Sequence, residues 1–177
     1  KGTVLLVMDS DSDKLYIQNT PNSGALSAVG PFGVNAASLG GFDITGTNLS
    51  ALAILNLASG VSRLYSINVL TGAASQIGSP DPAVGALRGI ALLPSAPPPA
   101  ATGDLFALTS GDQLINFSRA TPATTVSFGR LLGLKPGETM VGMDFRPKNG
   151  QFYGVGSLGN LYTINPDSAF VTLVAAL

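Results

Sequence analysis

A short segment recurs four times along this 177-residue chain, at intervals of about 50 residues. Every copy starts with leucine and continues with alternating side chains, a pattern that favours a short β-strand. The copies are Leu15–Asn19 (LYIQN), Leu64–Asn68 (LYSIN), Leu114–Ser118 (LINFS) and Leu161–Asn165 (LYTIN). A repeat of this length that is built from short strands is typical of the blades of a propeller.

A second segment lies upstream of three of these copies and has the pattern apolar-x-Gly-apolar-x-apolar. It occurs at 39–44 (LGGFDI), 87–92 (LRGIAL) and 140–145 (MVGMDF). Glycine inside a strand permits another backbone to approach closely. Further alternating stretches lie between the two segments and after the second one. Each full unit is therefore predicted to contain four short antiparallel strands.

We therefore predict an all-β, β-propeller-like fold of about four blades, each with four short antiparallel strands. Residues 1–177 are predicted to form a single domain, with repeat units at approximately 3–30, 38–78, 86–130 and 138–177. The first unit starts directly at its second strand (TVLLVM), so the first blade is expected to lack its inner strand. A β-solenoid or a sandwich is the alternative architecture.

The missing inner strand leaves three possibilities. The ring closes with a three-stranded blade, the chain is part of a larger propeller, or a strand from another molecule fills the vacancy. We expect the third, because only 11% of the residues are charged and the C-terminal stretch FVTLVAAL is apolar. The chain is then an extracellular structural or interaction protein that associates with itself, into a fibre or a surface assembly. The expected assembly edge consists of Val4, Leu5, Leu6, Val7, Phe170, Val171, Leu173 and Val174.

Composition excludes several other classes of protein. The net charge of −1 provides no basic surface for nucleic acid. Histidine and cysteine are absent, which removes common zinc ligands and the usual nucleophile–histidine arrangements. No apolar run reaches the roughly 18 residues that a membrane helix needs. The chain begins with Lys1 rather than Met, which fits a processed protein that is secreted or displayed at the cell surface.

Three alternating acids, Asp9, Asp11 and Asp13, have the spacing of the first half of a calcium loop. A calcium loop also has a glycine after the third acid and a glutamate farther on, whereas Lys14 follows here and no glutamate comes next. The matching segments of the other repeats keep small polar residues and glycine but not the acids. We therefore interpret the stretch as a turn between two strands, with calcium as the only cofactor considered.

Two further acids, Asp43 and Asp144, occupy the same position of the inner-strand segment, where the third copy has Ala91. Because the inner strands of a propeller surround its centre, these carboxylates are predicted to line the central channel. There they would bind backbone N–H groups, a cation or a sugar hydroxyl. A carbohydrate- or ligand-binding module is accordingly the alternative function, and a glycoside-active enzyme the third. We predict that the chain is not an enzyme.

Two triplets match the acceptor pattern for N-linked glycans, at Asn48 (NLS) and Asn116 (NFS). Asn116 lies within a predicted strand, which makes it the weaker candidate. Glycans are therefore included among the expected partners, beside further copies of the chain.

Residues 137–169, GETMVGMDFRPKNGQFYGVGSLGNLYTINPDSA, resemble a family of bacterial secreted and surface proteins described as a domain of unknown function. Its members carry runs of the type G-E-T-hydrophobic-x-G-x-D-F-R-P-x-x-G-Q-hydrophobic-Y, followed by G-x-L-Y-x-I-x-P. The segments SRLYSINVLTGAASQIG and GGFDITG are similar to other repeats of that family. The resemblance implies a propeller-like fold and an extracellular setting, and it assigns no catalytic residue.

Overall fold

The computed structural model describes residues 4–20, 22–44, 51–94 and 103–177. Within these residues the chain forms fifteen strands in four antiparallel sheets. The first sheet contains β1 (Leu5–Asp9), β2 (Lys14–Gln18) and β3 (Leu26–Pro31). The second contains β4 (Ser38–Ile44), β5 (Ala51–Asn56), β6 (Ser62–Ile67) and β7 (Ala74–Gly78). The third contains β8 (Leu87–Leu92), β9 (Leu105–Thr109), β10 (Gln113–Ser118) and β11 (Thr121–Arg130). The fourth contains β12 (Met140–Phe145), β13 (Phe152–Gly156), β14 (Asn160–Ile164) and β15 (Val171–Ala176).

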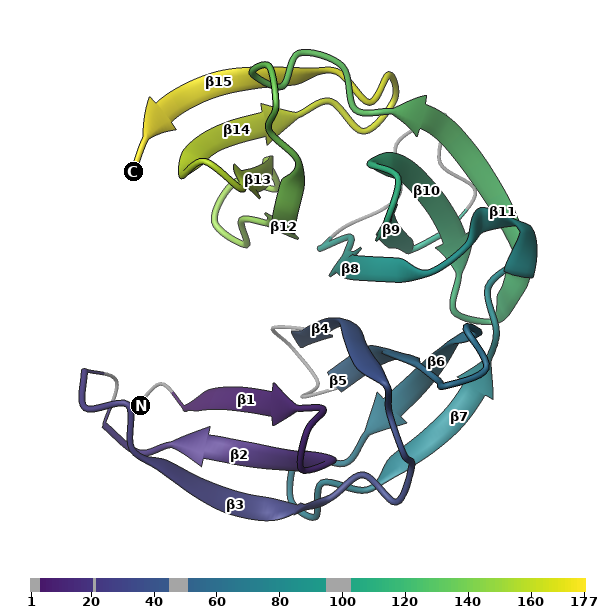
Figure 1. Ribbon diagram of the computed structural model, residues 1–177, viewed down its shortest axis with the longest axis vertical. Helices are drawn as coiled ribbons and strands as arrows, with labels where there is room; N and C mark the ends of the chain where they lie inside the picture. The colour runs from purple at the N-terminus through teal and green to yellow at the C-terminus, as the bar shows by residue number, and fades with distance from the viewer. Residues whose placement is uncertain (1–3, 21, 45–50, 95–102) are drawn as a thin grey trace.

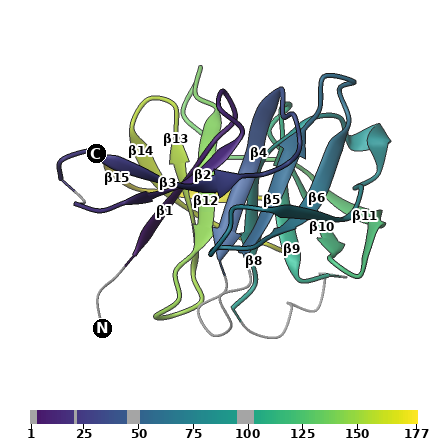
Figure 2. The same cartoon turned by 90° about the horizontal axis from the view of Figure 1, so that it is seen from below.

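The four sheets are the blades of a β-propeller and follow one another around a common centre in chain order (Figure 1). β4, β8 and β12 are the innermost strands of their blades, and they run across the thickness of the molecule in the view from the side (Figure 2). In the described residues the first blade has three strands, and β1 takes the innermost place. The predicted all-β propeller with a first blade short of its inner strand is confirmed.

The ribbons of the first and fourth blades stand apart, and both ends of the chain lie on this open side (Figure 1). At the junctions of the first with the second blade, the second with the third and the third with the fourth, side chains from adjacent sheets pack into three apolar clusters. We call the side of a blade that meets the following blade its front face, and the side that meets the preceding blade its rear face.

The alternation of each strand distributes its side chains between the two faces. In the third strand of a blade, the leading leucine points to the front and the next residue to the rear. Leu64, for example, packs against the third blade, whereas Tyr65 packs against the first. Every blade flanked on both sides is consequently apolar on both faces, which explains the low share of polar residues in these strands.

Side-chain oxygens at one repeated position attach each blade to the next. Asp13 Oδ1 accepts the backbone N–H of Ala36 at 2.9 Å. Ser62 Oγ accepts that of Leu87 at 3.0 Å, and Asp112 Oδ1 accepts that of Met140 at 3.0 Å. Each of these acceptors lies two residues before the leading leucine of its repeat. The fourth blade has Gly159 at this position.

The only helical element in the described residues is the 3-10 turn η1 (Pro82–Val84), which connects the second and third blades. Its first turn is capped by Asp81, whose Oδ1 accepts the backbone N–H of Ala83. None of the helices in the described part of the chain has the length and apolar character needed to cross a membrane.

Candidate functional site

The front face of the fourth blade carries the same apolar positions that are buried in the other blades. In the first three blades the leading leucine of the repeat is fully buried, at 0% exposure. Leu161, at the same position of the fourth blade, is only half-buried. Its cross-strand partner Val155 is also half-buried, although the equivalent Ile54 and Leu108 are at 0%. The face has the composition of a blade junction, and none of the four described sheets covers it.

The rear face of the first blade shows the same difference. Tyr16 is half-buried, whereas Tyr65 and Tyr162 at the equivalent position are buried. Val7 pairs with Tyr16 across the sheet and is half-buried as well. Leu5, farther along the same face, is exposed. This face also corresponds to a junction surface, and no other sheet in the described part of the chain packs against it.

These two faces lie on either side of the opening in the propeller (Figure 1). At each of the three formed junctions, a front face packs against a rear face. The uncovered faces are therefore complementary in kind: the fourth blade presents a front face and the first blade presents a rear face. We call them the terminal front face (Gly142, Asp144, Tyr153, Val155 and Leu161) and the terminal rear face (Leu5, Val7 and Tyr16).

The residues of the expected assembly edge have different environments. Val4 is exposed before β1, and Leu5 and Val7 belong to the terminal rear face. Leu6 points the other way and packs against the cluster between the first two blades. Phe170, Leu173 and Val174 are exposed at and along the outermost strand of the fourth blade.

The assignment of Val171 to that edge was wrong. Its side chain is 2% exposed and belongs to the cluster between the third and fourth blades. The backbone N–H of Val171 donates to the carbonyl of Leu132 at 2.7 Å, so the start of β15 is attached to the segment that follows β11.

Asp43 lies on β4 and connects the inner strands of two blades. Its Oδ2 accepts the backbone N–H of Leu92 on β8, and its Oδ1 accepts that of Ile44, both at 2.7 Å. Burial raises the pKa of Asp43 to about 6, and the nearby carboxylate of Asp144 contributes to the increase. Asp144 lies on β12 and is exposed. Both acids thus lie on innermost strands, and Asp43 accepts hydrogen bonds from the backbones of two of these strands.

The raised pKa of Asp43 predicts the pH dependence of stability. Its folded value of about 6 exceeds the unfolded value of 3.8, so the fold binds the proton more tightly. The contribution of this group to the free energy of unfolding therefore decreases as the pH rises from about 4 to about 6. Urea unfolding across this range should show a weaker decrease in Asp43→Asn than in the wild type. The control Asp167→Asn, in an exposed turn, should keep the wild-type slope, and equal slopes for all three proteins would contradict the prediction.

The three N-terminal acids lie in and beside the turn between β1 and β2, as interpreted from the sequence. Asp9 accepts hydrogen bonds from the Ser12 hydroxyl at 2.6 Å and from the backbone N–H of Asp11 at 3.0 Å. These bonds lower the pKa of Asp9. Asp13 forms the bond to the second blade described above. Within the described residues, no three acidic side chains are grouped closely enough to hold a metal ion.

The two glycosylation triplets have different outcomes. Asn48 lies outside the described residues. Asn116 is 0% exposed, and its Nδ2 donates to the carbonyls of Gly103 and Leu105 at 3.1 and 2.9 Å. A glycan would have to replace these bonds and occupy filled space. The prediction of glycosylation at Asn116 is therefore wrong for the folded chain.

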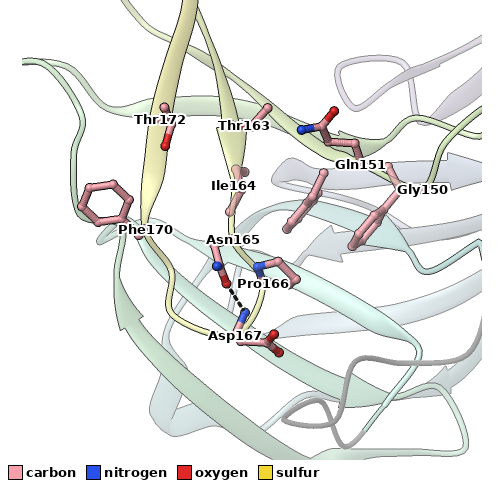
Figure 3. A pocket seen from close by; sticks show the side chains of 11 residues that line it. Gly150, Gln151, Thr163, Ile164, Asn165, Pro166, Asp167, Phe170 and Thr172 are labelled. Atoms are coloured by element: carbon pink, nitrogen blue, oxygen red, sulfur yellow. Dashed lines mark hydrogen bonds between the residues drawn. The ribbon is translucent and has the colours of Figure 1, made fainter.

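A cavity of about 450 Å³ opens at one end of the fourth blade (Figure 3). Thr163 and Thr172 lie on neighbouring strands above it, and Asn165 and Asp167 lie in the turn between these strands. Asn165 Oδ1 accepts the backbone N–H of Asp167 at 2.9 Å, which stabilises the turn. Phe170 also lines the cavity and is 52% exposed. The cavity therefore combines hydroxyl and amide groups with one accessible aromatic ring.

Sequence reasoning did not identify Tyr16, Val155, Leu161 or Gly142 as residues of an open face. The alignment of repeats contains the signal, because each of these residues matches a residue at a junction position in another blade. Their exposure depends on whether a neighbouring blade is present, which the pattern of one repeat does not reveal.

Solved propeller structures are similar to this chain. A gluconolactonase from Xanthomonas campestris superposes with a TM-score of 0.60 at 10% identity, over 98% of this chain and 58% of that one. BamB from Moraxella catarrhalis gives a TM-score of 0.45 at 12% identity, over 97% and 51% of the two chains. A glucose dehydrogenase gives 0.45 at 15% identity, over 93% and 51%. The chain thus spans little more than half the length of these proteins, and at such identities the likeness shows the fold alone.

No curated protein matches the chain in sequence. A family model does match, over residues 1–91 and 113–177, which include segments of all four blades. The chain belongs to the family described as Domain of unknown function (DUF4394).

Proposed function

We propose that this protein is a structural or interaction protein that associates with further copies of itself from head to tail. In the proposed contact, the terminal front face of one copy packs against the terminal rear face of the next. One observation carries the proposal: Leu161 and Tyr16 have the positions of residues that are buried at the formed junctions, yet both are half-exposed. The extracellular setting implied by the sequence resemblance is retained as part of the proposal.

Burial of apolar surface supplies the driving force. Full burial of one large apolar side chain contributes about 1.5–3 kcal/mol, and the half-buried residues of the two faces contribute a part of this each. Both faces present several such side chains and few charges, so desolvation opposes the contact weakly. Asp144 is the charged residue of the terminal front face.

The proposed contact joins two different faces and is therefore heterologous. Such contacts produce a closed ring when the rotation between copies closes, and a filament when it does not. Negative-stain electron microscopy of the wild-type protein separates the two outcomes.

Sedimentation velocity over a range of concentrations tests the association itself. The wild type should form species larger than a monomer, whereas Leu161→Asp and Tyr16→Asp should remain monomeric with unchanged circular dichroism. The matched control is Leu70→Asp, because Leu70 is 84% exposed in the turn between β6 and β7, away from both faces. This control should associate as the wild type does.

A mixing experiment tests the head-to-tail geometry. Leu161→Asp keeps an intact rear face and Tyr16→Asp keeps an intact front face, so one intact junction can form between the two variants. An equimolar mixture should therefore contain 1:1 dimers and nothing larger. A wild type that stays monomeric at every concentration would overturn self-association, and further blades from elsewhere would then be the candidates to cover these faces.

A second candidate function is carbohydrate binding, and the cavity in the fourth blade favours it. The Phe170 ring offers a surface for a sugar to stack on, and Thr163, Thr172 and Asn165 offer hydrogen-bonding groups. A glycan array probed with the wild type should then show binding that Phe170→Ala removes. Binding retained by this variant would exclude the cavity as the site.

The proposal assigns no catalysis to Asp43 and Asp144. Both carboxylate oxygens of Asp43 already accept backbone N–H groups, which leaves this residue in a structural role. The expectation that the chain is not an enzyme therefore remains part of the proposal.

A further inference from the structure

The inner strands of the second and third blades approach each other closely through two residues of β4. Asp43 Oδ2 accepts the backbone N–H of Leu92 on β8 at 2.7 Å. At Gly41, a Cβ atom would lie 2.5 Å from the backbone nitrogen of Ile90, so only glycine fits. A carboxylate and a glycine two residues apart thus hold the backbone of the next inner strand.

The same pair recurs on β12 as Gly142 and Asp144, on the terminal front face. Asp144 accepts a hydrogen bond from the backbone of Phe145, as Asp43 does from Ile44. Its side chain is exposed, and a Cβ atom at Gly142 would meet nothing within 4 Å. The glycine and carboxylate that lie against β8 in the second blade are therefore present on β12 as well, and among the described strands none lies against them.

The third blade shows that this pair is not required wherever two blades stack. β8 has Gly89 and Ala91 at these positions, so no carboxylate is available there. A Cβ atom at Gly89 would make ordinary contacts, 3.8 Å from Leu108 and 3.9 Å from Met143. The fourth blade has the glycine and aspartate of the second blade, whereas the third blade has glycine and alanine.

We infer that Gly142 and Asp144 receive the backbone of an extended segment with the inner-strand pattern apolar-x-Gly-apolar-x-apolar. One backbone N–H of the segment donates to the free carboxylate oxygen of Asp144, and its backbone lies over Gly142. The occupant is inferred from the formed junction, where β8, which has this pattern, lies against Gly41 and Asp43 in the same way.

The first blade offers a place where such a segment can bind. β1 corresponds to β5, whose inner edge is covered by β4 through pairs such as Ile44 with Ala51. Among the described residues, the equivalent edge of β1 has no strand beside it. Exposed sheet edges accept extended segments through main-chain hydrogen bonds. This inference rests on the proposed function, because head-to-tail contact brings the first blade of one copy beside the fourth blade of another.

A labelled synthetic peptide of residues 86–94, with lysines added at its ends, tests the inference by fluorescence anisotropy. The wild type should bind the peptide saturably. Gly142→Val, which fills the space over the glycine, and Asp144→Ala, which removes the acceptor, should each weaken binding about tenfold or more. The control is Asp167→Ala, which removes an exposed carboxylate in another part of the blade. This variant should bind the peptide as the wild type does.

The outcomes separate this inference from the proposed function. Thermal unfolding of both variants should stay close to that of the wild type, because Asp144 is exposed and a Cβ atom at Gly142 would meet nothing within 4 Å. Absence of peptide binding, or binding that both variants retain, would overturn the inference even if the wild type self-associates. Sedimentation measures self-association independently, and a monomeric wild type that binds the peptide in the expected manner would overturn only the head-to-tail proposal.

Discussion

Replacing Leu114 by alanine is expected to lower the free energy of unfolding by about 2–5 kcal/mol, whereas Leu161→Ala is expected to cost well under half as much. Both leucines lead the same repeat, but Leu114 is 0% exposed between the third and fourth blades and Leu161 is half-buried on the terminal front face. The first substitution leaves a cavity between two sheets, and the second trims a side chain that is already in contact with water.

Urea unfolding at a protein concentration low enough to keep the chain monomeric measures this difference. The comparison is well matched, because residue type, strand and register are the same at both positions. Equal losses in the two variants would show that Leu161 is already packed in the monomer. The terminal front face would then not be free.

Gly72→Ala is expected to destabilise the protein by about 3 kcal/mol or more, from backbone strain combined with overpacking. Gly72 has φ +81°, and a Cβ atom there would lie 2.3 Å from the carbonyl oxygen of Gly30 in the first blade. Neither atom belongs to a flexible side chain, so relief requires the two blades to separate.

The matched control is Gly60→Ala. Gly60 has nearly the same φ, +79°, but a Cβ atom there would meet nothing within 4 Å. Its substitution should cost only the left-handed strain of about 1–2 kcal/mol. Thermal and urea unfolding give the loss of unfolding free energy in each variant. The loss in Gly72→Ala minus the loss in Gly60→Ala is the cost of disturbing the contact between the two blades. Equal losses would show that the approach of Gly30 and Gly72 contributes nothing to stability.

Asp13, Ser62 and Asp112 illustrate how repeat position and chemistry combine in this fold. The repeats predict a turn around Asp13, because the equivalent segments of the other repeats contain glycine and small polar residues. It did not reveal that the side chain of this residue bonds to the next blade, because the partner is a backbone N–H group 23 residues away. Because every residue except proline has a backbone N–H group, the sequence does not show which of these groups a side chain will bind.

Asn116 and Val171 show a related limit. The triplet around Asn116 satisfies the acceptor pattern for a glycan, yet the residue lies inside β10, where its side chain donates to the carbonyls of Gly103 and Leu105. Val171 belongs to an apolar, uncharged stretch, but its position at the start of β15 directs it towards the third blade. Local pattern indicates that a residue is apolar or polar, and packing decides which surface it meets.

By itself the sequence determined the strands, their grouping into four repeats and the three strands that the described residues of the first repeat contain. These features follow from period-two alternation and from glycine positions, both of which act within a few residues of the chain. Only the tertiary structure decided which of several equivalent residues are covered. Leu114 and Leu161 occupy the same position of the repeat. The fourth blade covers Leu114, whereas no described blade covers Leu161, and burial requires surface from another sheet.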